Sequence, residues 1–105
     1  MSVIQINRKN IEEIKKSSKP VLLDFYADWC GPCRALSPLV HQIASEHPEY
    51  AVGKINVGEE PELASSFGVL SIPALFVLRD GKVVKSAVGV RPKKAILSLL
   101  EGEGA

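Results

Sequence analysis

Two cysteines, the only ones in the chain, lie two residues apart in the segment Trp29-Cys30-Gly31-Pro32-Cys33. This segment follows an apolar run and precedes a pattern typical of a helix. Residues three apart on a helix are neighbours on one face, so the two sulfurs can reach each other. The spacing therefore predicts a dithiol that cycles through a disulfide.

The predicted start of a helix gives the two cysteines different roles. Unpaired backbone N–H groups and the positive end of the helix dipole favour a thiolate on the leading residue. Cys30 is therefore the expected nucleophile, and Cys33 is the expected resolving thiol. Gly31 permits a tight entry into the helix, and Pro32 suits its first turn, where a missing N–H costs nothing. A static, buried cysteine pair is the alternative interpretation.

A zinc site is a second alternative, because His41 and His47 complete a Cys-Cys-His-His set with the two cysteines. If one helix runs from Cys33 to His47, its rise of about 1.5 Å per residue places His41 about 12 Å and His47 about 21 Å from Cys33. Pro38 would kink such a helix but would not fold it back. Zinc is therefore not expected, and both histidines are predicted to be surface residues.

Length and composition limit the class of protein. A chain of 105 residues, 46% hydrophobic and 24% charged, is expected to form one α/β domain over residues 1–105 with its own core. The formal net charge of +1 gives no electrostatic support for nucleic-acid binding. We expect a monomer, although the sequence does not determine the oligomeric state.

The chain carries no pattern of a signal peptide or a membrane span. Residues 1–10 lack a continuous apolar segment, and no stretch approaches the roughly 20 apolar residues needed to cross a bilayer. We therefore expect a cytoplasmic protein with no membrane contact. In a reducing compartment, a lone cysteine pair at this spacing favours catalysis or metal binding over a structural disulfide.

Hydrophobic periodicity predicts strands that alternate with helices and then a hairpin and a closing helix. This order indicates a central mixed sheet of four or five strands flanked by helices. Asp80-Gly81 is a strong hairpin turn signal, and the tail from Glu101 to Ala105 is expected to fray. The predicted strands are 2–6, 21–27, 51–57, 73–78 and 82–88, and the predicted helices are 8–17, 30–47, 60–67 and 92–100.

Asp24 lies in the middle of the most apolar predicted strand, Val21 to Ala27. Burial there disfavours the carboxylate and should raise its pKa. One interpretation is a structural group that makes hydrogen bonds. The other, which we prefer, is a proton acceptor and donor for Cys33.

The order of elements and the run from Asp24 to Cys33 resemble the thioredoxin family over essentially the whole chain. Further matches are Lys54-Ile55-Asn56-Val57 in the third strand, Ile72-Pro73 before the hairpin and Gly89 after the last strand. The resemblance implies the thioredoxin fold, with four helices around the sheet. It also implies a thiol–disulfide oxidoreductase that acts as an electron carrier through a Cys30–Cys33 disulfide and binds no cofactor.

The resemblance also implies roles for residues outside the cysteine motif. Asp24 matches the family's buried acid, thought to exchange a proton with the resolving cysteine, and Lys54 matches the lysine near that acid. A solvated lysine at a strand edge is the alternative for Lys54. Ile72 and Pro73 match a cis peptide beside the disulfide that docks substrate, whereas Pro73 by itself suggests only a proline that opens a strand.

Five further residues complete the expected docking rim. Trp29 would cover the motif, although core packing is an equal alternative for it. Gly89 would allow close approach of a substrate backbone, and Val90 follows it. Gly31 and Pro32, between the cysteines, are also assigned to substrate binding. Such an apolar rim would bind extended segments of many proteins weakly.

Several positions depart from the commonest family pattern. Gly58 stands where an acid usually follows Asn-Val, and Tyr26 stands where tryptophan is frequent. Ser71 and Ala74 flank Ile72-Pro73 where glycine and threonine are common, and Leu70 occupies an often polar position. Gly58 and Tyr26 are not expected to take part in the reaction, whereas Leu70, Ser71 and Ala74 are expected to alter which partners dock.

The predicted function is a protein disulfide reductase that acts on oxidised cytoplasmic proteins, such as reductases and peroxidases that need a dithiol donor. No dinucleotide fingerprint is present, so electrons must come from a partner, which the resemblance implies is a thioredoxin reductase. A disulfide oxidase or isomerase on the same fold is one alternative, although Gly31-Pro32 resembles the reductant class. A binding module with incidental thiols is the other.

Overall fold

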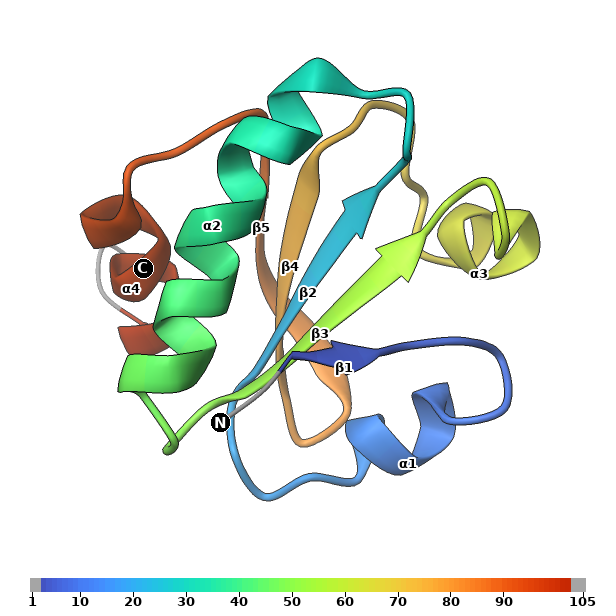
Figure 1. The fold of residues 1–105 in the computed structure, drawn as a ribbon. Coiled ribbons are helices and arrows are strands. Elements are labelled where there is room, and N and C mark those ends of the chain that lie inside the picture. Colours follow the sequence, from blue (N-terminus) through green and yellow to red (C-terminus); the bar gives the residue numbers. More distant parts are fainter. Residues whose placement is uncertain (1–2, 103–105) are drawn as a thin grey trace.

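The computed structural model describes residues 3–102 and is shown in Figure 1. Strands and helices alternate through most of this range, as the hydrophobic periodicity predicts. In chain order the elements are β1 (Ile4–Gln5), α1 (Ile11–Lys15), β2 (Val21–Tyr26), α2 (Gly31–Glu46), β3 (Ala51–Asn56), α3 (Pro61–Ser66), β4 (Ala74–Arg79), β5 (Lys82–Val88) and α4 (Lys93–Glu101).

The sheet has five strands in the order β1-β3-β2-β4-β5. The strands β1, β3 and β2 run parallel, whereas β4 pairs antiparallel with β2, and β5 pairs antiparallel with β4. The predicted mixed sheet is therefore confirmed, with β2 at its centre. Its central place explains why Val21 to Phe25 are all buried, since both faces of β2 are covered.

Helices cover both faces of the sheet, so the fold has three layers (Figure 1). Helices α2 and α4 lie on one side, and α1 and α3 lie on the other. Alternate residues of each strand point to opposite faces and build two separate cores. The buried core on the α2 and α4 side includes Leu22, Leu36, Val40, Ile43, Leu75, Val77, Ile96 and Leu100. The core on the α1 and α3 side includes Ile6, Ile11, Ile14, Val21, Leu23, Phe25, Ile55 and Leu78.

The hairpin between β4 and β5 turns at Asp80-Gly81, as predicted. Both residues have positive φ, 53° for Asp80 and 79° for Gly81. Two successive residues of this kind give a turn whose twist matches the flanking strands, and Gly81 adopts it without steric cost.

The first strand and the first helix are shorter than predicted. Strand pairing covers only Ile4–Gln5, and Ser2 lies outside the described residues. Helix α1 begins at Ile11 because Asn7 and Asn10 form a turn before it: the Asn7 N–H donates to Asn10 Oδ1, and the Asn10 N–H donates to Asn7 Oδ1. These local side-chain bonds compete with helix formation.

The ends of two other elements also differ from expectation. Strand β4 begins at Ala74, one residue after Pro73. The expectation of fraying from Glu101 is wrong for Glu101 itself, which ends α4, and Gly102 caps the helix in the left-handed conformation. Residues 103–105 lie outside the described range. Among residues 3–102 no helix has the length and apolarity needed to cross a membrane.

Candidate active site

The cysteine motif lies where β2 leads into α2. Cys30 is the N-cap residue of α2, with extended backbone angles, and Pro32 occupies the first turn. The Cys33 backbone N–H donates to Cys30 Sγ at 3.2 Å. One of the N–H groups that a helix start leaves unpaired therefore points at the Cys30 sulfur and would stabilise negative charge on it in the reduced protein.

Cys30 and Cys33 form a disulfide, with Cα atoms 5.2 Å apart. Both residues are buried, in one cluster with Ala27. Ile72 packs against this cluster from the loop before β4. A residue about forty positions after Cys33 in the chain therefore contacts the redox centre. Gly31 and Pro32, between the cysteines, are exposed and leave one side of the motif open to a partner.

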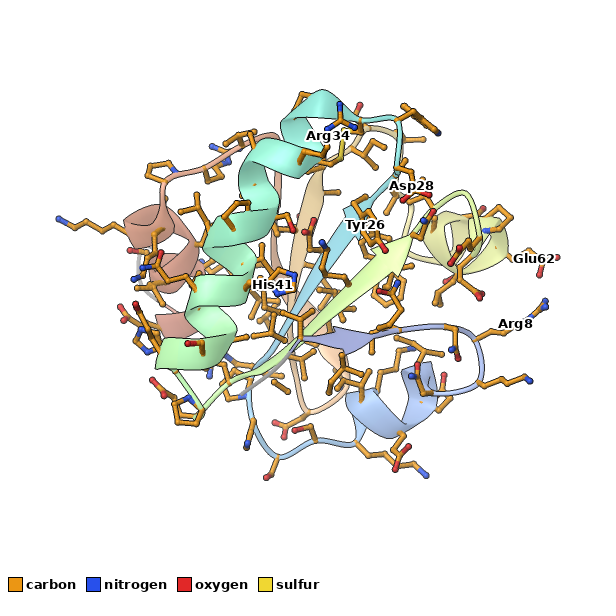
Figure 2. The ribbon with its side chains drawn as sticks, viewed as in Figure 1. Arg8, Tyr26, Asp28, Arg34, His41 and Glu62 are labelled. Atoms are coloured by element: carbon orange, nitrogen blue, oxygen red, sulfur yellow. A yellow bond between two sulfur atoms is a disulfide. The ribbon has the colours of Figure 1, made fainter. Side chains whose placement is uncertain are left out.

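The loop before Cys30 is held by contacts that the sequence did not reveal. Arg34, in the first turns of α2, donates from Nη1 to the Asp28 carbonyl oxygen at 2.8 Å, and Figure 2 shows both residues at the same end of the molecule. Asn56, at the end of β3, donates from Nδ2 to Asp28 Oδ1 at 3.4 Å and accepts from the Gly58 N–H at 2.9 Å. An asparagine two residues before a glycine is the signal that could have identified this turn.

Asp24 is fully buried on the sheet face that α2 covers. Its register partners are Lys54 on β3 and Leu75 on β4, so it has one charged and one apolar neighbour across the strands. Burial raises the pKa of Asp24 from 3.8 to about 6, and the positive charge of Lys54 opposes this shift. The predicted direction of the shift is confirmed.

The carboxyl oxygens of Asp24 accept no hydrogen bond from any residue in the range 3–102. A structural hydrogen-bonding role therefore finds no support in the contacts of Asp24. A buried acid that titrates near neutral pH and is free of protein partners can instead exchange a proton with a neighbouring group.

Lys54 lies inside the sheet, because β3 pairs with β1 on one side and with β2 on the other. Its ammonium donates to Ser37 Oγ on α2 at 2.8 Å and lies 4.5 Å from the centroid of the Tyr26 ring. Lys54 therefore does not lie at a strand edge, and its side chain is half-buried. Neither Ser37 nor Tyr26 stood out as a partner for Lys54 in the sequence.

The loop before β4 brings two distant segments together. The Ile72–Pro73 peptide bond is cis, as the family resemblance implied. The Pro73 carbonyl oxygen accepts from the Gly89 N–H at 2.8 Å, so the segment after β5 lies beside this loop. Gly89 has φ of +94°, a conformation that favours glycine.

Two apolar side chains near the motif are exposed. Trp29 is 76% exposed, and Val90 is 48% exposed. Core packing is therefore wrong as an account of Trp29, whose ring is available to a partner. Cys30, Cys33, Ile72, Pro73 and Gly89 thus form one connected region, with Trp29 and Val90 exposed beside it in the chain.

Sequence and structure comparisons place this geometry in a known family. The Thioredoxin family profile matches residues 2–102. Thioredoxin from Streptomyces clavuligerus is 45% identical over 85 residues, which cover 81% of this chain and 79% of that protein. The chain belongs to the thioredoxin family.

Other members of the thioredoxin family match over a similar or greater length. Thioredoxin 1 from Synechococcus elongatus is 43% identical over 91 residues, covering 86% of this chain and 85% of that protein. The solved structure of a mutant thioredoxin from Halobacterium salinarum superposes with a TM-score of 0.90 and 36% identity, over 99% of this chain and 92% of that one. The thioredoxin fold is thereby confirmed.

Members of the thioredoxin family are thiol–disulfide oxidoreductases that need no cofactor, and this chain is one of them. Its redox-active group is the Cys30–Cys33 disulfide. Within residues 3–102 no three His, Cys, Asp or Glu side chains are grouped so that they could hold a metal ion. His41 is exposed, whereas His47 is half-buried: it contacts a Glu49 carboxylate oxygen at 2.9 Å and stacks on the Tyr50 ring.

Three of the departures from the commonest thioredoxin pattern, Leu70, Ser71 and the buried Ala74, flank the cis-proline loop, whereas Tyr26 is half-buried at the end of β2. Leu70 is 97% exposed, and Ser71 follows it. Both line a groove of about 440 Å³ that also includes Ala74 and Val88. Gly58 is exposed at the turn after β3.

Proposed function

We propose that this protein is a protein disulfide reductase in which Cys30 attacks and Cys33 resolves. The observation that carries the proposal is the position of Cys30 at the N-terminus of α2, with the Cys33 N–H directed at its sulfur. This contact favours the thiolate on the leading cysteine. Helix polarity therefore distinguishes the two cysteines.

The proposed exchange has two steps. The Cys30 thiolate attacks one sulfur of a substrate disulfide, forms a mixed disulfide and releases the other substrate sulfur as a thiolate. The Cys33 thiolate then attacks Cys30 Sγ, forms the Cys30–Cys33 disulfide and releases the second substrate sulfur. Two electrons pass to the substrate, whose two thiolates take up two protons.

Asp24 is proposed to accept the Cys33 proton before the second step. Its raised pKa, about 6, makes the buried carboxylate a base strong enough to act near neutral pH. Lys54 is proposed to limit that shift through its positive charge. The thiolate of Cys33 forms only while Asp24 holds the proton. Cys33 and Asp24 therefore need not carry a negative charge at the same time.

Substrate docking is proposed at the surface around the motif. Ile72 and Pro73 would present backbone groups to an extended substrate segment, and Gly89 leaves room beside Pro73 for a second backbone. Trp29 and Val90 supply exposed apolar surface, and Gly31 and Pro32 form the exposed link between the cysteines. A rim of this kind suits many substrates bound weakly.

Electrons are proposed to come from a thioredoxin reductase and to pass to oxidised cytoplasmic proteins, among them reductases and peroxidases that need a dithiol donor. The protein is proposed to act as a monomer with one domain. Family membership supports this assignment, because thiol–disulfide exchange returns the protein to its disulfide form after each turnover.

Trapping of the mixed disulfide tests the order of attack. Cys33→Ser removes the resolving thiol, so covalent complexes with an oxidised protein should accumulate on Cys30. Cys30→Ser serves as the matched control and should accumulate none. If the two variants give the reverse result, Cys33 is the nucleophile and the proposed roles are wrong.

The reduction potential of the couple tests the direction of electron flow. Thioredoxins have potentials of about −270 mV, and protein disulfide isomerase has about −180 mV, a difference of about 4 kcal/mol. We expect a value near the thioredoxin figure, measured by titration against a dithiol buffer and alkylation of free thiols. A value near −180 mV would replace the reductase assignment with an oxidase or isomerase.

A further inference from the structure

The Lys54 ammonium is close to Asp24 but binds elsewhere. Lys54 and Asp24 are register partners on adjacent strands, so their side chains lie on the same face of the sheet. The Asp24 oxygens nevertheless accept no hydrogen bond from residues 3–102. The ammonium donates to Ser37 Oγ at 2.8 Å instead. A neutral hydroxyl thus takes the place that a buried carboxylate could have taken.

Ser37 is well placed to control this lysine. It lies four residues after Cys33 on α2, so the two side chains project from one face of the helix. Ser37 is half-buried, and its bond to Lys54 joins residues 17 positions apart in the chain. The helix that carries both cysteines is therefore linked to β3 through this hydroxyl.

Tyr26 supports the ammonium from the strand side. Its ring centroid lies 4.5 Å from Lys54 Nζ, within the range of a cation–π interaction. The Tyr26 hydroxyl accepts from Gln5 Nε2 at 3.1 Å, which ties the ring to β1. Figure 2 shows Tyr26 on the strand side and His41 on α2. The position of the ammonium is therefore set by one helix and two strands.

We propose that Ser37 is a positioning residue that holds the Lys54 ammonium near Asp24 without letting the two side chains form an ion pair. A direct ion pair would keep Asp24 ionised and unable to carry a proton, whereas loss of the nearby charge would leave its carboxylate harder to form. The Ser37 hydroxyl and the Tyr26 ring keep the Lys54 charge near enough to favour the Asp24 carboxylate but prevent a direct ion pair with it. The inference deepens the proposed function, because it rests on proton exchange at Asp24.

Few other charges reach this region. Lys54 is the charged neighbour from β3, and Leu75 from β4 carries no charge. From α2, Cys33 does not titrate in the disulfide form, and His41 lies one turn beyond Ser37. The other neighbouring elements bring side chains without a full charge to this face. They are the Tyr26 phenol on β2, the neutral Gln5 on β1 and the apolar Ile96 on α4.

The test follows the titration of Asp24 in the oxidised protein, through its side-chain carboxyl carbon resonance by NMR. In Ser37→Ala, the flexible and strongly hydrated Lys54 ammonium should turn toward water. Asp24 then loses the charge that favours its ionised form, so its titration midpoint should move up by about 0.5 pH unit. Ser37→Thr keeps the hydroxyl and should restore the original midpoint.

Two controls separate this effect from general perturbation. Ser45→Ala makes the same change at an exposed site on α2 and should leave the midpoint in place. His41→Gln replaces the histidine that lies one turn beyond Ser37 on α2, and Ser37→Ala should shift Asp24 equally in that background. Lys54→Met should also raise the midpoint, and adding Ser37→Ala to it should have no further effect.

An unchanged midpoint, a downward shift or full additivity with Lys54→Met would overturn the role of Ser37. Turnover is measured on the same variants as a function of pH. If the Asp24 midpoint moves and the pH profile of turnover does not follow, Ser37 positions Lys54 as proposed and the catalytic role of Asp24 fails. The two failures are therefore distinguishable.

Discussion

The two faces of β2 differ sharply although they belong to one strand. On one face, Phe25 packs against Phe67 and Phe76, with ring centroids 5.2 and 5.3 Å from its own. On the other face, the next residue along the strand toward the N-terminus, Asp24, places a carboxyl beside Lys54 beneath α2. None of these three rings can titrate, whereas the face beneath α2 holds a buried acid.

This difference shows how one strand serves both stability and chemistry. Burial of apolar rings stabilises the fold through both removal from water and ring contacts. Burial of Asp24 has the opposite effect, because raising its pKa from 3.8 to about 6 costs about 3 kcal/mol at neutral pH. The aromatic face therefore offsets part of a cost that the redox face incurs.

The largest expected effect is a loss of stability when the aromatic face is truncated. Phe25→Ala removes a fully buried ring from the centre of the three-ring cluster. The resulting cavity and lost transfer energy should lower the free energy of unfolding by about 3 to 5 kcal/mol. Urea denaturation of the oxidised protein measures this change.

Phe25→Leu is the matched control, since it keeps most of the apolar volume and should cost clearly less. A loss below about 1 kcal/mol for Phe25→Ala would mean that the site collapses around the smaller side chain. The contrast between the two faces would then not extend to energetics.

On the face beneath α2, a substitution at Asp24 is expected to change the free energy of unfolding in the opposite direction. Asp24→Asn replaces a buried carboxylate with a neutral group of the same shape, so it should raise the free energy of unfolding by about 2 to 3 kcal/mol above pH 7. Turnover at neutral pH should fall, because the proton acceptor for Cys33 is lost. Unfolding curves and steady-state rates across pH measure the two effects.

The pH dependence of this gain has a defined direction. The folded protein holds the Asp24 proton more tightly than the unfolded chain, so the stability of the original protein relative to Asp24→Asn declines as pH rises from about 4 to about 6. The difference should be near zero at about pH 3 and constant above about pH 7. A difference that is independent of pH, or turnover that is unchanged at every pH, would contradict the role assigned to Asp24.

The smallest effect on stability is expected at the exposed rim, which belongs to neither face. Trp29→Ala should change the free energy of unfolding by less than about 0.5 kcal/mol, because the side chain is 76% exposed. If the ring contacts substrates, kcat/KM for a protein disulfide should fall by about tenfold. Trp29→Phe, which keeps an aromatic surface, should lose less.

A small-molecule disulfide provides the comparison for that measurement, since it needs little of the rim and should react with Trp29→Ala at nearly the original rate. Equal losses on the small and the protein substrates would assign Trp29 to the chemistry at Cys30 and not to docking.

Much of the fold could be predicted because each prediction depended on neighbours in the chain. The apolar run at β2, the turn at Asp80-Gly81 and the helix start at Pro32 each reflect local preferences. The errors arose where local competitors were missed, as in the turn that Asn7 and Asn10 form before α1. Pro38 was expected only to kink α2, and the helix does continue past it to Glu46.

The candidate site was predictable where one segment contains it and unpredictable where several meet. Cys30 and Cys33 follow from spacing alone, and the raised pKa of Asp24 follows from its apolar surroundings in the sequence. The bonds from Asn56 and Arg34 to Asp28, and from Lys54 to Ser37, join residues of different elements. No periodicity in the chain marks such contacts.

The sequence by itself determined which groups could react, namely a cysteine pair at a helix start and an acid in a buried strand. It also determined the family that the chain resembles. Only the tertiary structure decided which neutral groups hold the Lys54 charge and that Asp24 has no protein partner within residues 3–102. The physical reason is the distance along the chain over which each kind of interaction acts. Preferences for helices, turns and burial act over a few residues, whereas the position of an ammonium depends on how α2 packs across β2 and β3.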